Sequence, residues 1–148
     1  VSITYVSSTT NEVLGEVTRK FVLKKYSSML ILDTVTEGMK FQGVNLPLMG
    51  WGMSEDSGAS IHMAIDGVDV TEGTVRYVRE DVLKLFTGYG GRKTNVKPGF
   101  SNVVDMSSYK DGVHSVSITY VSSTTNEVLG EVVVSCISYS IYITFSMP

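Results

Sequence analysis

The first seventeen residues alternate apolar and polar side chains in a way that predicts a β-hairpin. Val1, Ile3 and Tyr5 occupy every second position, which is the period of a half-buried strand. Polar residues 7–11 favour a turn, and residues 13–17 return to an apolar, strand-like pattern. An isolated hairpin is only marginally stable in water, so we expect it to join a larger sheet.

The same segment, VSITYVSSTTNEVLGEV, recurs without a change at residues 116–132. The offset of 116 − 1 = 115 residues suits one small domain better than a solenoid repeat of about 20–50 residues. We therefore divide the chain into residues 1–28, the duplicated last hairpin of a preceding module, and residues 29–148, a β-sandwich domain.

The two copies compete, because the chain holds one set of remaining strands for two identical hairpins. The first copy is either the end of a preceding module, the favoured interpretation, or an element exchanged with a neighbouring chain, as in domain swapping. Beyond the repeat the copies differ. Residues 18–25 are basic and suit an exposed edge strand, whereas residues 133–145 are uncharged and alternate in the manner of a long strand.

The rest of the chain also has the period of short strands. The sequence Asp66-Gly67 is a strong signal for a tight hairpin turn. Residues 79–86 predict one short helix with acidic residues at its start, where the helix dipole favours them. Roughly seven to nine strands with regular turns indicate an all-β, antiparallel β-sandwich with one short connecting helix. The strands between the two hairpins are expected at residues 29–32, 41–48, 61–65, 68–70, 74–78 and 99–106.

Composition agrees with this fold class and excludes several others. The 14 glycines and 8 tyrosines suit β-structure, and 43% apolar residues are enough for a packed core. A net charge of −3 gives no basic surface for nucleic acid. The single cysteine, Cys136, excludes an intrachain disulfide. We expect no membrane span, because the uncharged tail is too short and too polar, and we find no signal peptide at the start.

A series of short motifs over residues 29–133 resembles a bacterial immunoglobulin-like module found in tandem in clostridial and actinobacterial secreted, cell-wall-associated proteins. The resemblance implies an immunoglobulin-like sandwich, located outside the cell or on its surface, and it implies no activity. We expect no enzymatic activity and no cofactor. One departure is Glu80, where the family usually has proline. The matching motifs are Asp33-Thr34, Gly38, Gly50-Trp51, Asp66-Gly67, Arg79-Glu80-Asp81-Val82, Gly88-Tyr89, Gly99-Phe100, Asp105 and Gly112-Val113-His114.

Five residues are candidates for ligand binding: Trp51, Tyr77, Arg79, Asp81 and Tyr89. Trp51 could stack on a sugar, although its position between two glycines favours a core tryptophan between the sheets. Arg79 and Asp81 could bind a ligand, but a structural charge-assisted hydrogen bond is the favoured interpretation. Tyr77 and Tyr89, with Tyr109 and the loop 88–98, could form a contact surface, the alternative being ordinary turn tyrosines.

Metal and catalytic sites find little support. Acidic residues that could bind calcium are spread over two turns without EF-hand spacing, so a solvated acidic rim is favoured; they are Glu55, Asp56, Asp66, Asp69 and Glu72. The two histidines, His62 and His114, lie on different predicted strands, which makes a zinc site improbable. We find no serine–histidine–aspartate signature and no phosphate-binding loop.

These observations predict a non-catalytic structural or interaction module of a multi-module extracellular bacterial protein. Its expected partners are copies of the same module, joined by β-strand exchange between neighbours. The alternative is an accessory module of a secreted hydrolase that binds cell-wall polysaccharide. Nucleic acid is not expected as a partner.

Overall fold

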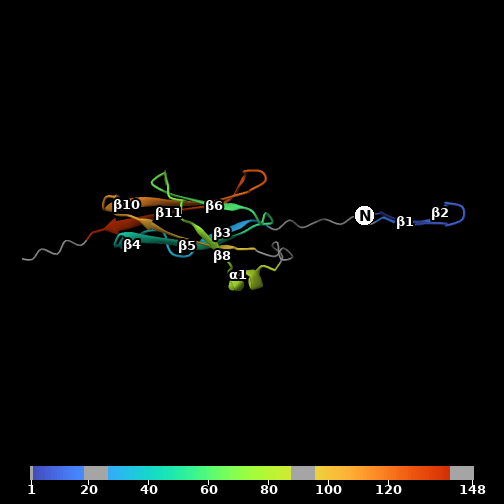
Figure 1. The fold of residues 1–148 in the computed structure, drawn as a ribbon, viewed down its shortest axis with the longest axis horizontal. Helices are drawn as coiled ribbons and strands as arrows, with labels where there is room; N and C mark the ends of the chain where they lie inside the picture. The colour runs from blue at the N-terminus through green and yellow to red at the C-terminus, as the bar shows by residue number, and fades with distance from the viewer. Residues whose placement is uncertain (1, 19–26, 88–95, 141–148) are drawn as a thin grey trace, which may run out of the picture.

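The computed structural model describes residues 2–18, 27–87 and 96–140, which form a β-sandwich and a separate β-hairpin (Figure 1). This confirms the predicted all-β sandwich with one short helix. The elements are β1 (Ser2–Val6), β2 (Val13–Thr18), β3 (Met29–Leu32), β4 (Met39–Gln42), β5 (Asn45–Met53), β6 (Ser60–Ile65), β7 (Val68–Asp69), β8 (Val75–Tyr77), α1 (Glu80–Leu85), β9 (Gly99–Asp105), β10 (Gly112–Val121) and β11 (Val128–Tyr139).

Two sheets make up the sandwich. The β5 sheet has the order β3-β5-β9-β8, and the β10 sheet has the order β4-β11-β10-β6-β7. In Figure 1, β10, β11 and β6 lie in one layer, while β5 and β8 lie in the other with α1 on the far side. Neighbouring strands are antiparallel except β4 and β11, which pair in parallel, a detail that the sequence pattern did not predict.

The core lies between the sheets because alternate side chains of each strand point inward. In β6, Ile61, Met63 and Ile65 are buried, whereas Ser60 and His62 are exposed. β10 has the same alternation over its length, and from Val116 on this is the pattern that the sequence predicts. Each aliphatic side chain buried in this way contributes about 1.5–3 kcal/mol to stability.

The Asp66-Gly67 turn joins β6 to β7 as predicted. Both residues have positive φ angles, 51° and 79°, which matches the backbone of a tight two-residue hairpin turn. By contrast, the strand predicted at residues 41–48 is two strands. Gly43, with a φ angle of 125°, separates β4 from β5, and β5 continues to Met53.

The segments after the two hairpins can be compared with the prediction only in part. The uncharged tail forms a long strand, β11, up to Tyr139, and the rest of the strand predicted to residue 145 lies outside the described residues from 141 on. The basic strand expected at residues 18–25 lies outside the described residues, except for Thr18 at the end of β2.

A second apolar cluster lies on the outer side of the β5 sheet. Helix α1 buries Val82 against Met53, and Trp51 and Phe86 pack beside them. Glu80 and Asp81 stand in its first turn, as the sequence predicts. No helix within the described parts of the chain has the length and apolar character that a bilayer crossing requires.

Candidate functional site

The two identical segments fold into hairpins with the same pairing. Tyr5 lies opposite Gly15 in the first hairpin, as Tyr120 lies opposite Gly130 in the second. In both, the register shifts directly after the tyrosine. The pairing is therefore determined within the seventeen residues and does not depend on their surroundings.

The loops of the two hairpins also share their internal hydrogen bonds. The Ser7 hydroxyl accepts from the amides two and three residues on, at 3.3 and 3.2 Å, and the Ser122 hydroxyl does so at 3.2 Å in both cases. Asn11 and Asn126 take up nearly the same left-handed conformation, with φ angles of 58° and 57°. Asparagine tolerates this conformation better than most residues.

The hairpins differ in what covers their apolar face. In the second hairpin, Ile118 and Tyr120 are 0% and 3% exposed and belong to the core. Their counterparts Ile3 and Tyr5 are 68% and 70% exposed. Within the described residues, β1 and β2 pair with each other alone, and Figure 1 shows this hairpin apart from the sandwich. The first hairpin therefore presents to solvent the face that the second one buries.

Specific contacts hold the second hairpin in its sandwich. The hydroxyl of Tyr120 lies 3.2 Å from that of Ser54, and the guanidinium of Arg76 lies 5.9 Å from the centre of the tyrosine ring. This distance and placement suit a cation–π interaction. Gly52 faces the same ring, because a Cβ atom built there would lie in van der Waals contact with it, at 3.4 Å.

The loop of the second hairpin is bound by Asp56. This carboxylate accepts from the Ser122 hydroxyl at 2.8 Å and from the amide and hydroxyl of Ser123 at 2.8 and 2.9 Å. We call this arrangement the Asp56 site. These hydrogen bonds, the one from Ser122 above all, hold the pKa of Asp56 well below its usual range. The sequence predicts Asp56 only as part of a solvated acidic rim; the residue is indeed partly exposed, and its carboxylate in addition binds the second loop.

In the first hairpin, the corresponding loop residues are Ser7 and Ser8, and Ser8 is exposed. The Asp56 carboxylate is already engaged with other donors. It accepts from the loop of the second hairpin, and it accepts from the amide of Gly58 at 2.9 Å. The first hairpin thus combines an exposed apolar face with a polar loop whose outer hydroxyls face solvent.

Four of the five predicted ligand-binding residues meet elsewhere, on the outer side of the β5 sheet. Trp51 and Tyr77 lie on either side of Gly99, with which both are paired. A Cβ atom at Gly99 would come within 2.7 Å of the Tyr77 ring and 2.9 Å of Arg79 Cγ, so these side chains cover it. Tyr89, the fifth residue, lies outside the described part of the chain.

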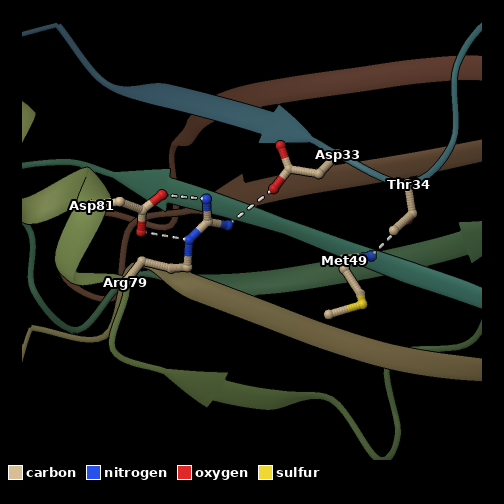
Figure 2. Close-up of polar contacts among 5 residues, drawn as sticks. All are labelled: Asp33, Thr34, Met49, Arg79 and Asp81. Atoms are coloured by element: carbon tan, nitrogen blue, oxygen red, sulfur yellow. Dashed lines mark hydrogen bonds and ion pairs between the residues drawn. The ribbon is translucent and has the colours of Figure 1, made fainter.

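Arg79 is occupied by two carboxylates (Figure 2). Its Nε and Nη2 donate to Asp81 at 2.8 and 2.7 Å, and its Nη1 donates to Asp33 at 3.0 Å. The guanidinium lowers the pKa of Asp81 to about 2, and the carboxylates of Asp81 and Asp33 raise that of Arg79. The contact ties the start of α1 to the end of β3, the structural role favoured by the sequence.

The residue after Asp33 strengthens this junction. The Thr34 hydroxyl accepts from the amide of Met49 at 2.9 Å (Figure 2). It also donates to the carbonyl of Pro47 at 2.7 Å. The Asp33-Thr34 pair thus fixes the end of β3 to both α1 and β5.

Trp51 packs in an apolar cluster, but not in the one between the sheets. Its side chain is half-buried, with its ring centre 5.4 Å from that of Phe86. Its neighbours Gly50 and Gly52 face inward, because Cβ atoms there would meet Phe100 and Tyr120. Alternation along β5 therefore directs Trp51 outward, and this corrects the expectation of a tryptophan between the sheets.

The structure brings together an aspartate, a histidine and a serine that the sequence did not connect. His114 Nδ1 lies 2.7 Å from Asp66, and its Nε2 lies 3.0 Å from the Ser138 hydroxyl and 2.8 Å from the carbonyl of Lys110. A carbonyl oxygen only accepts, so Nε2 donates to it and cannot take the serine proton. This differs from a catalytic triad, in which Nε2 is the base. The cluster is best described as a set of structural hydrogen bonds that join β10, β11 and the β6–β7 turn.

Sequence reasoning missed the Asp56 site and the His114 cluster because their members are far apart in the chain. The one available signal was the Asp66-Gly67 turn, whose carboxylate also lies 2.8 Å from the amide of Ser115. Tyr109 packs edge-on against His114, with ring centres 5.6 Å apart, and is not on the expected contact surface with Tyr77. Among the described residues, no group of three His, Cys, Asp or Glu side chains is placed to hold a metal ion.

Compared with protein-family models and with curated protein sequences, the chain matches none.

Proposed function

We propose that this chain is a non-catalytic structural and interaction module of a multi-module extracellular bacterial protein. Its N-terminal hairpin is the element that joins it to another module by β-strand exchange. The observation that carries the proposal is that one sequence occupies two environments. Ile118 is fully buried in the second hairpin, whereas Ile3 is 68% exposed in the first.

An exposed hairpin of this kind is suited to adding strands to another sheet. Every second side chain of β1 is apolar, and these side chains share one face. The edge of β1 that faces away from β2 carries the backbone groups through which its counterpart β10 pairs with β6. In strand addition, backbone hydrogen bonds supply affinity and the alternate side chains supply specificity.

The test measures mass in solution with light scattering, using the full chain and an acceptor variant that carries both Ile118→Asp and Ile3→Asp. The carboxylate at the buried position 118 should expel the second hairpin and open its place in the sandwich, and the one at position 3 should keep the acceptor's own first hairpin from filling that place. Wild type added to this variant should form a 1:1 complex, and wild type carrying Ile3→Asp should not. Trp51 fluorescence reports whether the variant keeps its fold, because Trp51 packs with Phe86 in a different cluster. A folded variant that captures neither chain would refute the proposal.

The second candidate function is binding of cell-wall polysaccharide. It is supported by the gathering of Trp51, Tyr77, Arg79 and Asp81 on one side of the β5 sheet. Soluble cell-wall polysaccharide should then change the emission of Trp51, the only tryptophan, and Tyr77→Ala should reduce the response. An emission spectrum that stays constant over the titration would count against this function.

A further inference from the structure

We propose that the first hairpin docks into a β-sandwich of this same fold that has no last hairpin of its own. We further propose that this acceptor binds the hairpin loop with a carboxylate placed as Asp56 is. The inference rests on the proposed function and identifies the partner by its chemistry.

The second hairpin is an internal template for the docked state. An acceptor that fits the identical first hairpin must offer what surrounds Tyr120, namely a hydroxyl such as Ser54 and a cation such as Arg76. It must also offer a side chain like Leu30, which lies against Gly130 with its Cβ 3.1 Å from a Cβ built there. Gly15, the counterpart in the first hairpin, has nothing within 4 Å of the same position.

A second intact copy of the chain does not supply such an acceptor. Each chain carries two copies of the repeated hairpin but one sandwich that can bury a copy. Exchange between two intact chains therefore leaves one copy per chain exposed and buries no additional surface. The resident hairpin also has more pairing. β10 and β11 continue beyond the repeat, with Gly112 opposite Ser138, and β11 pairs with β4 from Cys136 to Tyr139. The resident hairpin is also tethered to its sandwich, which gives it a high effective concentration.

The loop of the first hairpin needs a carboxylate from the acceptor. In the second loop, Asp56 takes two hydroxyl donors and one amide donor from Ser122 and Ser123. Ser7 and Ser8 are the same residues in the first loop, and Ser8 is exposed. Hydrogen bonds to an ionised carboxylate are about twice as strong as those between neutral groups, so this contact distinguishes a matching acceptor from an unrelated sheet.

The repeat permits a direct test. Residues 27–115 placed immediately before Val1 of the full chain regenerate the sequence of residues 27–132 without a linker. Ile3→Cys then reports docking through its rate of reaction with a small thiol reagent. In the chain without the added segment (the ordinary chain) this thiol should react fast. In the chain with residues 27–115 added before Val1 (the extended chain) it should react about 100-fold more slowly. Ile118→Cys, at a fully buried position, gives the rate of a docked hairpin, and the native Cys136 is buried and common to all samples.

The carboxylate is tested within the added segment alone. Asp56→Asn there should speed the reaction of the Ile3→Cys thiol about tenfold, and the control Glu72→Gln should leave it unchanged. Equal rates with and without Asp56→Asn would overturn the role of the carboxylate. If the Ile3→Cys thiol reacted equally fast in the ordinary and extended chains, docking would be overturned. This outcome is independent of the proposed function, which is tested by binding of wild type to the acceptor variant with Ile118→Asp. Dimers of wild type alone that disappear with Ile3→Asp would identify a second copy as the occupant and overturn the proposal.

Discussion

Gly130 lies so close to Leu30 that a Cβ atom added at Gly130 would approach Leu30 Cβ to 3.1 Å. This contact joins β11 to β3 across the sandwich. The same atom added at Gly15 would meet open space. The two glycines occupy the same place in identical hairpins, so any difference between their variants reports the environment and not the local sequence.

We expect Gly130→Val to destabilise the full chain by about 1–3 kcal/mol, because the larger side chain overpacks the core beside Leu30. Gly15→Val should change the free energy of unfolding by less than about 0.5 kcal/mol. Urea unfolding of both variants, followed by Trp51 fluorescence, gives the comparison. Equal losses for the two variants would contradict the difference in burial described for the hairpins.

Stability should fall in acid because several carboxylates are hydrogen-bonded in the folded state. The pKa values of Asp56, Asp66 and Asp81 are all lowered on folding, that of Asp81 to about 2. A group whose pKa is lowered in the folded state stabilises that state above its unfolded pKa, about 4, and the effect is lost as pH falls below it.

Urea midpoints measured from pH 7 to pH 2 should therefore decrease mainly below about pH 4. Asp56→Asn should lower the midpoint at pH 7 and show a smaller further decrease in acid. Glu72→Gln is the matched control, and it should follow the wild-type curve. A variant curve parallel to that of wild type throughout would show that Asp56 has no such role.

The ion pairs of Arg79 should contribute modestly. The side chains of Arg79 and Asp33 are 25% and 40% exposed, and pairs of this kind typically give about 0.2–1 kcal/mol. A double-mutant cycle with Arg79→Met and Asp33→Asn should yield a coupling energy in that range, decreasing in 1 M salt, where screening extends to about 3 Å. A coupling above about 2 kcal/mol would show that the contact is more desolvated than its exposure indicates.

The packing of Trp51 should be visible in its fluorescence. Phe86→Ala removes the ring 5.4 Å from that of Trp51 and should shift the emission to longer wavelength by admitting water. It should also cost about 1–3 kcal/mol, less than a fully buried phenylalanine, because Phe86 is half-buried. Leu85→Ala, at an exposed position of the same helix, is the control and should leave the spectrum unchanged.

Local pattern predicted most elements of the fold correctly. The alternation in residues 61–65, the Asp66-Gly67 turn and both hairpins follow from contacts between residues close in sequence. The side of β5 to which Trp51 points does not, because it depends on Phe100 and Tyr120 filling the space beside Gly50 and Gly52. The sequence shows which side chains of a strand point inward only when polar and apolar residues alternate clearly. Residues 45–53 are mostly apolar or glycine, so they give no such signal.

The candidate site could be predicted in part. The repeat identifies the two hairpins and their competition for one place in the sandwich. Because their sequences are identical, the sequence predicts the same burial for both, and only the structure shows which one is covered. The Asp56 site was not predictable, since Asp56 and Ser122 are 66 residues apart and neither belongs to a recognisable motif.

The identical hairpins have a consequence for the kinetics of folding. Both hairpins pair locally and should form early, whereas the pairing of either one with β6 joins distant parts of the chain and is slower to form. During refolding, the two identical hairpins therefore compete for the place beside β6. Chains in which the first hairpin takes this place must release it before they reach the native state, so we expect a slow refolding phase whose amplitude disappears when Ile3→Asp makes the first hairpin unfit for the core.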